Sequence, residues 1–276
     1  MSTATVFSYS IGRKLVMGIT GLFLVSFLFV HLGGNALLFI PDNGETFNAF
    51  VRFMTTNPLI KVLEWGLFAG FIVHIIYAAI LTRQNAAARP TAYAFKGNQG
   101  KSANWFSRNM GLTGTIFLVF LLSHITMFWG AYKFGDSNGQ ATLEQAYTFS
   151  YKVKEDVIVP DGTVIVKSGH YIDFEELTLA RNMGLSTKPV AIKNMTGIVA
   201  DSFKQWWIVL LYVCAMVVLG LHLNHGFQSA FRSVGFVHSK YSGFLSKLGT
   251  GIAVVFPAVF ALMPILYFLL PGTYSA

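Results

Sequence analysis

Apolar residues in this chain gather in long unbroken runs and do not alternate with polar positions. The four clearest runs carry no charged side chain, and they are Leu15–Ile40, Asn109–Tyr132, Gln205–Phe231 and Leu248–Ala276. A fifth run, Trp65–Thr82, is shorter and reaches a similar length with a few flanking residues. A helix rises about 1.5 Å per residue, so about 20 apolar residues cross the hydrocarbon core of a bilayer. Each run is therefore long enough to span a membrane.

These runs predict an all-α integral membrane protein, a single membrane domain with five transmembrane helices. The expected spans are residues 15–40, 61–83, 109–132, 205–231 and 246–270. The composition agrees, because 54% of the 276 residues are hydrophobic and only 12% are charged, which is too apolar for an ordinary soluble domain. We expect the first four helices to form a bundle.

The segment 133–204 is the one sizeable region outside the expected spans, and we interpret it as a small loop cap. VIVPDGTVIV alternates around a Pro-Asp-Gly turn and predicts a β-hairpin, whereas FEELTLARN predicts a short helix. Its His170 reads as a solvated loop residue. We expect no internal repeat, and no glycine loop of the kind that binds phosphate.

Basic residues predict the orientation of the spans. Three segments on one side hold ten lysines and arginines and no acid: Arg13, Lys14, Arg83, Arg89, Lys96, Lys101, Arg108, Arg232, Lys240 and Lys247. The positive-inside rule makes this side and the N-terminus cytoplasmic, with the segment 133–204 on the far, periplasmic side. The net charge is +8, and the excess basic residues lie beside the spans. Binding to lipid headgroups or to an acidic partner therefore explains this charge better than binding to nucleic acid.

Four successive runs each contain a histidine at a definite depth. His31 and His124 lie 17 and 16 residues from the nearest cytoplasmic basic residue, and His74 and His222 lie 9 and 10 residues from theirs. Helical rise converts these spacings to about 25 Å and about 14 Å, which defines a far level and a near level. An imidazole in hydrocarbon is costly without a partner, so such residues are candidate functional sites.

Two histidines at one level suit a haem iron better than a zinc ion. Spans one and three supply the far level, and spans two and four supply the near level, which are diagonal pairs when sequential helices are neighbours. Zinc needs three or four ligands at one level. His225 is an alternative to His222, because residues three apart differ by only about 60° around a helix. Gly70 and Gly226 are each four residues from a near-level histidine and are expected to leave room for a macrocycle.

Several stretches resemble a known family. GRKLVMGITGLFLVSFLFVHLGGN, the lone His74 and His124, and LYVCAMVVLGLHLNHGFQSAFRSVG are similar to the five-span, two-haem cytochrome b subunit of succinate dehydrogenase and fumarate reductase. The resemblance covers all five spans and leaves the segment 133–204 poorly matched. It implies that His31 and His124 bind a distal haem b and that His74 and His222 bind a proximal one. His222 precedes a glycine by four residues, as the family ligand does, and His225 would then lie near a propionate or the quinone.

The family resemblance also implies partners and a location. The subunit would anchor a flavoprotein subunit and an iron-sulfur subunit on the cytoplasmic face of a bacterial inner membrane, as respiratory complex II of the tricarboxylic acid cycle. It would exchange electrons with menaquinone or another quinone. The chain has one cysteine, Cys214, and no Rossmann fingerprint, so FAD, iron-sulfur clusters and the dicarboxylate site belong to the partner subunits. Cys214 itself is expected to pack within its span.

Glu64 is the candidate catalytic residue of a quinone site. It lies ten residues before His74, about 15 Å further from the cytoplasm by helical rise and near the far level. Quinol oxidation releases protons, and a partly buried carboxylate there could accept one. The alternative is an interfacial carboxylate that faces water or pairs with Lys61.

Two other functions fit the same pattern. The chain could be the cytochrome b subunit of another quinone-linked oxidoreductase, such as a nitrate reductase. It could also be a transporter that uses the histidines as a proton relay. A spectrum with a b-type haem band would separate the cytochromes from the transporter.

Overall fold

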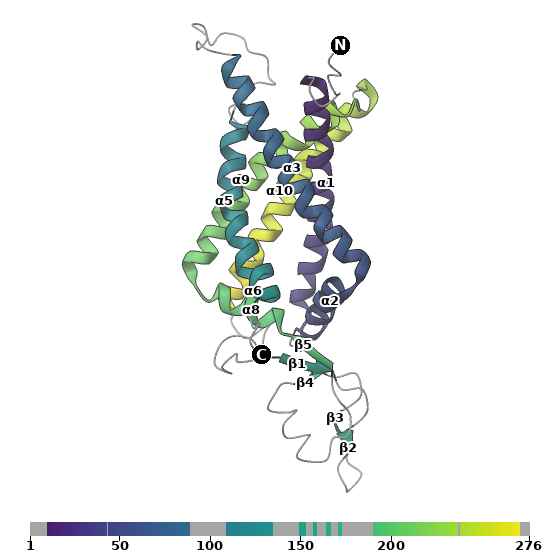
Figure 1. The fold of residues 1–276 in the computed structure, drawn as a ribbon. Helices are drawn as coiled ribbons and strands as arrows, with labels where there is room; N and C mark the ends of the chain where they lie inside the picture. Colours follow the sequence, from purple (N-terminus) through teal and green to yellow (C-terminus); the bar gives the residue numbers. More distant parts are fainter. Residues whose placement is uncertain are drawn as a thin grey trace. The chain divides into compact units, whose positions relative to one another are not determined.

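A computed structural model describes residues 10–42, 44–88, 109–134, 149–152, 157–158, 164–166, 171–172, 190–236 and 238–270. Five of the helices in these ranges are long and apolar enough to cross a membrane (Figure 1): Ile11–Phe39, Pro58–Ala87, Met110–Phe134, Trp206–Ser233 and Ser239–Leu269. The prediction of an all-α membrane protein with five spans is confirmed. Several helices run a few residues beyond the predicted limits, most of all the last, which begins at Ser239.

The labels in Figure 1 follow these helices. The spans are α1 (Ser10–Ala36), α3 (Pro58–Ala87), α5 (Met110–His124), α9 (Trp206–Ser233) and α10 (Ser239–Leu269). Two of them are extended by short segments: α1 by the 3-10 turn η2 (Leu37–Phe39), and α5 by the π-helix η3 (Ile125–Gly130) and α6 (Ala131–Phe134). Two further helices, α2 (Glu45–Thr56) and α8 (Met195–Phe203), were not expected from the apolar runs.

The far-side segment contains short strands. The strand β2 (Val157–Ile158) pairs antiparallel with β3 (Val164–Val166), as the hairpin prediction requires. A second sheet has the order β4-β1-β5, built from β1 (Phe149–Lys152), β4 (Tyr171–Ile172) and β5 (Val190–Lys193). The helix expected at FEELTLARN, and His170, lie outside the described residues.

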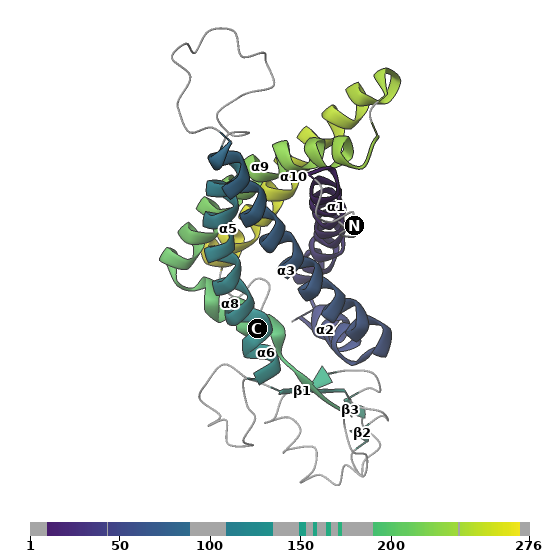
Figure 2. The same ribbon diagram turned by 45° about the horizontal axis from the view of Figure 1, so that its top comes forward.

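The chain divides into two compact units, which are described separately. The first consists of Met1–Gly33, Lys61–Leu122 and Leu210–Pro264, and the second of Gly34–Ile60, Ser123–Val209 and Ile265–Ala276. The first unit contains most of α1, α3, α5, α9 and α10, which are seen from two directions in Figures 1 and 2. The second contains α2, α8 and the strands.

Two close contacts join α3 to its neighbours in the first unit. A Cβ atom added to Gly70 of α3 would lie 3.0 Å from the ring of Phe23 on α1. A Cβ atom added to Gly111 of α5 would lie 3.0 Å from the hydroxyl oxygen of Thr82 on α3. Small residues let helices approach this closely, which is how helices associate where burial from water gives no driving force. The helix α3 therefore packs between α1 and α5.

Two more contacts close the ring of helices. The rings of Phe120 on α5 and Tyr212 on α9 meet edge to face, with centroids 4.8 Å apart. A Cβ atom added to Gly18 of α1 would lie 3.1 Å from the carbonyl oxygen of Ala230 on α9. The four helices are thus joined in the cycle α1, α3, α5, α9 and back to α1. This is a bundle in which α3 and α9 are diagonal, as expected when sequential neighbours are adjacent.

The fifth span packs on the outside of this cycle. Phe256 of α10 contacts Phe29 of α1 edge to face, with centroids 4.6 Å apart. Gly249 of α10 lies against the ring of Phe227 on α9, where an added Cβ atom would come within 2.6 Å of Cδ1. Other side chains of this helix face outwards, and Val254 is 62% exposed. Such apolar exposure suits contact with lipid.

The second unit is held by a polar network between α2 and the start of α8. The side chain of Asn48 is 2% exposed, and its amide donates to Oδ1 of Asn194 at 3.0 Å. Its own Oδ1 accepts from the backbone N–H of Thr196 at 3.0 Å. Gly44 has φ of 81° and faces the Thr196 side chain, where an added Cβ atom would lie 2.3 Å from Oγ1. Glycine is therefore required at this turn.

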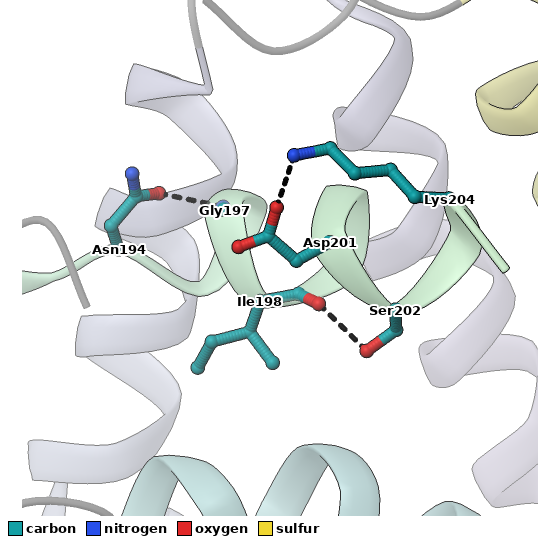
Figure 3. A network of polar contacts seen from close by, with 6 residues as sticks. All are labelled: Asn194, Gly197, Ile198, Asp201, Ser202 and Lys204. Atoms are coloured by element: carbon teal, nitrogen blue, oxygen red, sulfur yellow. Dashed lines mark hydrogen bonds and ion pairs between the residues drawn. The ribbon is translucent and has the colours of Figure 1, made fainter. Parts of the chain in front are cut away.

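Local contacts define the ends of α8 (Figure 3). The Asn194 side chain caps the helix by accepting from the backbone N–H of Gly197 at 2.9 Å. Near the other end Ser202 donates to the carbonyl of Ile198 at 2.8 Å, and Lys204 pairs with Asp201. This exposed ion pair contributes little to stability. The capped first turn is what presents Thr196 to Asn48.

Candidate haem-binding site

His74 lies on α3 with one edge of its ring against α1. Its Nδ1 is 3.1 Å from Oγ1 of Thr20, within hydrogen-bonding distance. A Cβ atom added to the adjacent Gly21 would lie 3.5 Å from Cε1 and 4.0 Å from Nδ1 of this ring. The Nδ1 edge therefore faces the Thr-Gly pair, and Nε2 points away from it.

His222 repeats this arrangement on the other side of the bundle. It lies on α9, and its Nδ1 is 3.4 Å from Oγ1 of Thr113 on α5. A Cβ atom added to Gly114 would lie 3.3 Å from Cε1 and 3.7 Å from Nδ1 of this ring. Thr113 is buried, with only 4% of its surface exposed. Each near-level histidine is thus held by a Thr-Gly pair on the preceding span.

The two imidazoles occupy diagonal helices of one bundle. Each ring is held at its Nδ1 by a threonine of another span, His74 by Thr20 of α1 and His222 by Thr113 of α5. That His74 and His222 bind the same iron atom stays a prediction.

The glycines that contact these two imidazoles are not the ones that we expected from the sequence. Gly70 accommodates the ring of Phe23, and an added Cβ atom at Gly226 would meet Cε of Met110 at 3.7 Å. The space that we expected for a macrocycle at Gly70 is therefore filled by a phenylalanine. Gly21 and Gly114, on the facing helices, are the ones that contact the imidazoles.

Sequence reasoning missed the two threonines, although the chain contains a signal for them. MGITGLFLVSFLFVH (17–31) and MGLTGTIFLVFLLSH (110–124) have the same length and share Met, Gly, Thr, Gly, Phe, Leu and His at equivalent positions. The expectation that the chain has no internal repeat is wrong. In each copy the threonine precedes the histidine by 11 residues, which is about 20° more than three full turns. Thr20 and His31 therefore share one face of α1, and Thr113 and His124 share one face of α5.

His31 lies near the end of α1 among aromatic rings. It stacks on Phe27 of its own helix, with centroids 5.3 Å apart, and contacts Phe260 of α10 at 5.6 Å. The assignment of His31 as a distal ligand stays a prediction.

His124 is the last α-helical residue before the π-helix η3, which begins at Ile125. Single π-helical turns are frequently found at functional sites, because they redirect the side chains that follow them. The imidazole lies 5.3 Å from the ring of Phe128, which in turn lies 5.9 Å from Phe203. His31 belongs to the first unit and His124 to the second, so their proposed pairing also stays a prediction.

The other two candidate residues are only half-buried. His225 lies one turn after His222 on α9. Glu64 lies on α3, ten residues before His74. Cys214, expected to pack inside its span, is exposed on α9, so that expectation is wrong.

The donor set at the near level fits a haem. Among the described residues, no group of three or more His, Cys, Asp or Glu side chains could hold a metal ion, whereas two axial imidazoles complete the coordination of a haem iron. His74 and His222 come from opposite helices, and each presents Nε2 away from the helix that binds its Nδ1. A metal-bound histidine usually has such a partner on its other nitrogen.

Comparisons with protein-family models, with curated proteins and with solved structures find no match to this chain.

Proposed function

We propose that this chain is the dihaem cytochrome b subunit of a succinate:quinone oxidoreductase, either a succinate dehydrogenase or a fumarate reductase. The observation that carries the proposal is the diagonal pair His74 and His222 inside a closed four-helix bundle, with each Nδ1 held by a threonine. The family resemblance in the first and fourth spans supports the same assignment. His74 and His222 would hold the proximal haem b, and His31 and His124 the distal one.

The proposed role is electron transfer between a quinone and catalytic partners. Haem b supplies a one-electron redox centre when it is bound, and two such centres would connect the two faces of the membrane. The chain would place a flavoprotein subunit and an iron-sulfur subunit on the cytoplasmic face, at the end where Arg13, Lys14 and Arg232 lie. Glu64 would accept a proton from menaquinol or another quinol near the far face.

The proposed location is the bacterial inner membrane, with the N-terminus in the cytoplasm. The ten basic residues without accompanying acids on one side support this orientation. Fusing a reporter that is active only in the periplasm to the end of each span would test it. Activity of the fusion after Phe134 and inactivity of the fusion after Ala87 are expected.

The first experiment is a reduced-minus-oxidised absorbance spectrum of the complex purified through a tag on this chain. The proposal expects a b-type haem band, two haems per chain and succinate-dependent reduction of the haem. Oxidation of the reduced haem by nitrate, without reduction by succinate, would identify the alternative cytochrome b subunit. A chain that is folded in the membrane and carries no haem would overturn the proposal and favour a histidine-relay transporter.

A further inference from the structure

We propose that Thr20 and Thr113 are positioning residues that accept a hydrogen bond from Nδ1–H of His74 and His222, which holds both imidazoles as the tautomer with a free lone pair on Nε2. This inference deepens the proposed function, because Nε2 is the atom that would bind iron. It rests on that function only for the haem measurements described below.

The direction of these hydrogen bonds follows from the threonine hydroxyls. A hydroxyl has a single proton to donate. That of Thr20 is directed to backbone carbonyls of its own helix, 2.9 Å from Val16 O and 3.2 Å from Met17 O. Its oxygen therefore presents lone pairs to His74, and the proton between Oγ1 and Nδ1 belongs to the imidazole.

Thr113 is arranged in the same way. Its hydroxyl lies 3.1 Å from the carbonyl oxygen of Met110 and 3.4 Å from that of Asn109. The remaining contact, at 3.4 Å to Nδ1 of His222, is then accepted by the threonine. Which ring nitrogen carries the proton is decided by the hydrogen bond that the ring makes. Both rings thus have Nδ1 protonated and Nε2 available.

The Thr-Gly pair does two things for one imidazole. The threonine binds Nδ1, and the glycine that follows it leaves the ring edge room to approach the helix, because an added Cβ atom would lie 3.3 Å from Cε1 of His222. The repeated Met-Gly-x-Thr-Gly sequence therefore builds two equivalent cradles, one on α1 and one on α5. The same helices then carry His31 and His124 on the same faces, 11 residues further along.

The test compares Thr20→Val and Thr113→Val with Thr20→Ser and Thr113→Ser. Valine keeps the shape of threonine and removes the acceptor, whereas serine keeps the hydroxyl. Thr115→Val is the matched control, because Thr115 is an exposed residue of α5 whose hydroxyl donates to the Gly111 carbonyl of its own helix. All variants are made in the full chain.

The first measurement is the ¹⁵N spectrum of histidine ring nitrogens in the full chain purified without haem. Protonated and unprotonated ring nitrogens resonate far apart, so the tautomer is read directly. We expect Nδ1–H tautomers for His74 and His222, each altered only by the valine variant of its own threonine. Nε2–H tautomers, or spectra unchanged by both valine substitutions, would overturn the inference.

The second measurement uses the haem-loaded complex. In a valine variant, loss of the acceptor should weaken retention of one haem about tenfold to a hundredfold and leave the other haem in place. The midpoint potential of the affected haem should rise, because a less basic imidazole stabilises ferric iron less. The serine variants should restore both properties, and Thr115→Val should match the wild type. Unchanged retention and potential in both valine variants would contradict the inference. Absence of haem from the wild-type complex would instead contradict the proposed function, and the ¹⁵N result would still decide the tautomers.

Discussion

Gly220 of α9 faces the backbone carbonyl oxygen of Ala253 on α10, and a Cβ atom added to this glycine would lie 2.8 Å from that oxygen. Ala253 stands four residues before Pro257, which has no N–H and so cannot provide the usual helical partner for this carbonyl. The contact explains why glycine is present at the crossing of α9 and α10. A backbone oxygen cannot move aside as the end of a flexible side chain can.

The first prediction is that Gly220→Ala loosens the packing of α10. Forcing a methyl group into this contact should lower the free energy of unfolding by about 1–3 kcal/mol, the usual cost of overpacking. Thermal unfolding in detergent measures it. Gly251→Ala is the control on α10, because nothing lies within 4 Å of its added Cβ atom. Equal unfolding temperatures for the two variants would show that the close contact does not matter.

The second prediction concerns the pairing of the histidines. His74→Ala and His222→Ala should each remove the same haem, and His31→Ala and His124→Ala should each remove the other. The reason is that one axial imidazole alone holds a b-type haem weakly. Redox titration of each purified variant identifies the missing centre by its midpoint potential.

The pairing of the histidines can be tested with a control variant and has outcomes that would refute it. His238, exposed at the start of α10, is expected to be replaceable by alanine without loss of haem. Loss of the same haem from His31→Ala and His74→Ala would refute the two-level arrangement. Retention of both haems in His222→Ala together with loss in His225→Ala would transfer the role to His225.

The third prediction is that Glu64→Gln slows quinol oxidation without changing haem content. Glutamine has nearly the same shape and cannot accept a proton, and the loss of a general base typically reduces a rate by about a hundredfold or more. Quinol-dependent reduction of fumarate, followed alongside the haem spectrum, measures both quantities. Glu45→Gln, on α2, is the control carboxylate and should keep the rate. A rate within twofold of the wild type for Glu64→Gln would favour the interfacial interpretation.

The fourth prediction is that Asn48→Ala destabilises the second unit. The substitution would remove the Oδ1 acceptor from the buried N–H of Thr196 and one of the donors from the Asn194 side chain. Loss of a partner from a buried polar group costs about 1–3 kcal/mol. Amide hydrogen exchange of α2 and α8 should accelerate accordingly. Thr56→Ala, whose exposed hydroxyl bonds to Arg52 of its own helix, should leave the exchange rates unchanged.

The five spans could be predicted because the thickness of a bilayer sets the length of an apolar run, and no packing detail is needed. The same reasoning could not find α2. Its apolar residues cover only one face, and its start depends on the turn at Gly44 and on Asp42, whose carboxylate accepts from the N–H of Thr46 at 2.9 Å. Such a helix looks like part of a connecting loop until its partner Asn194 is known.

The candidate site was predicted only in part, for a related reason. Histidines are conspicuous in an apolar run, so His74 and His222 could be selected by depth alone. Threonines are not, because a hydroxyl in a helix can always bond to its own backbone, as Thr115 does. Gly70 was misinterpreted because its sequence position could not reveal that Phe23 fills the adjacent space. Side-chain partners on other helices decide these roles.

The network of Asn48 with Asn194 and Thr196 joins residues that are 146 and 148 positions apart in the chain. During synthesis α2 is completed long before α8 exists. Two further spans are inserted before the Asn48 amide can form its hydrogen bonds. Because the loop that closes is so long, the contact adds little to early assembly, and it can form only after the start of α8 has been made.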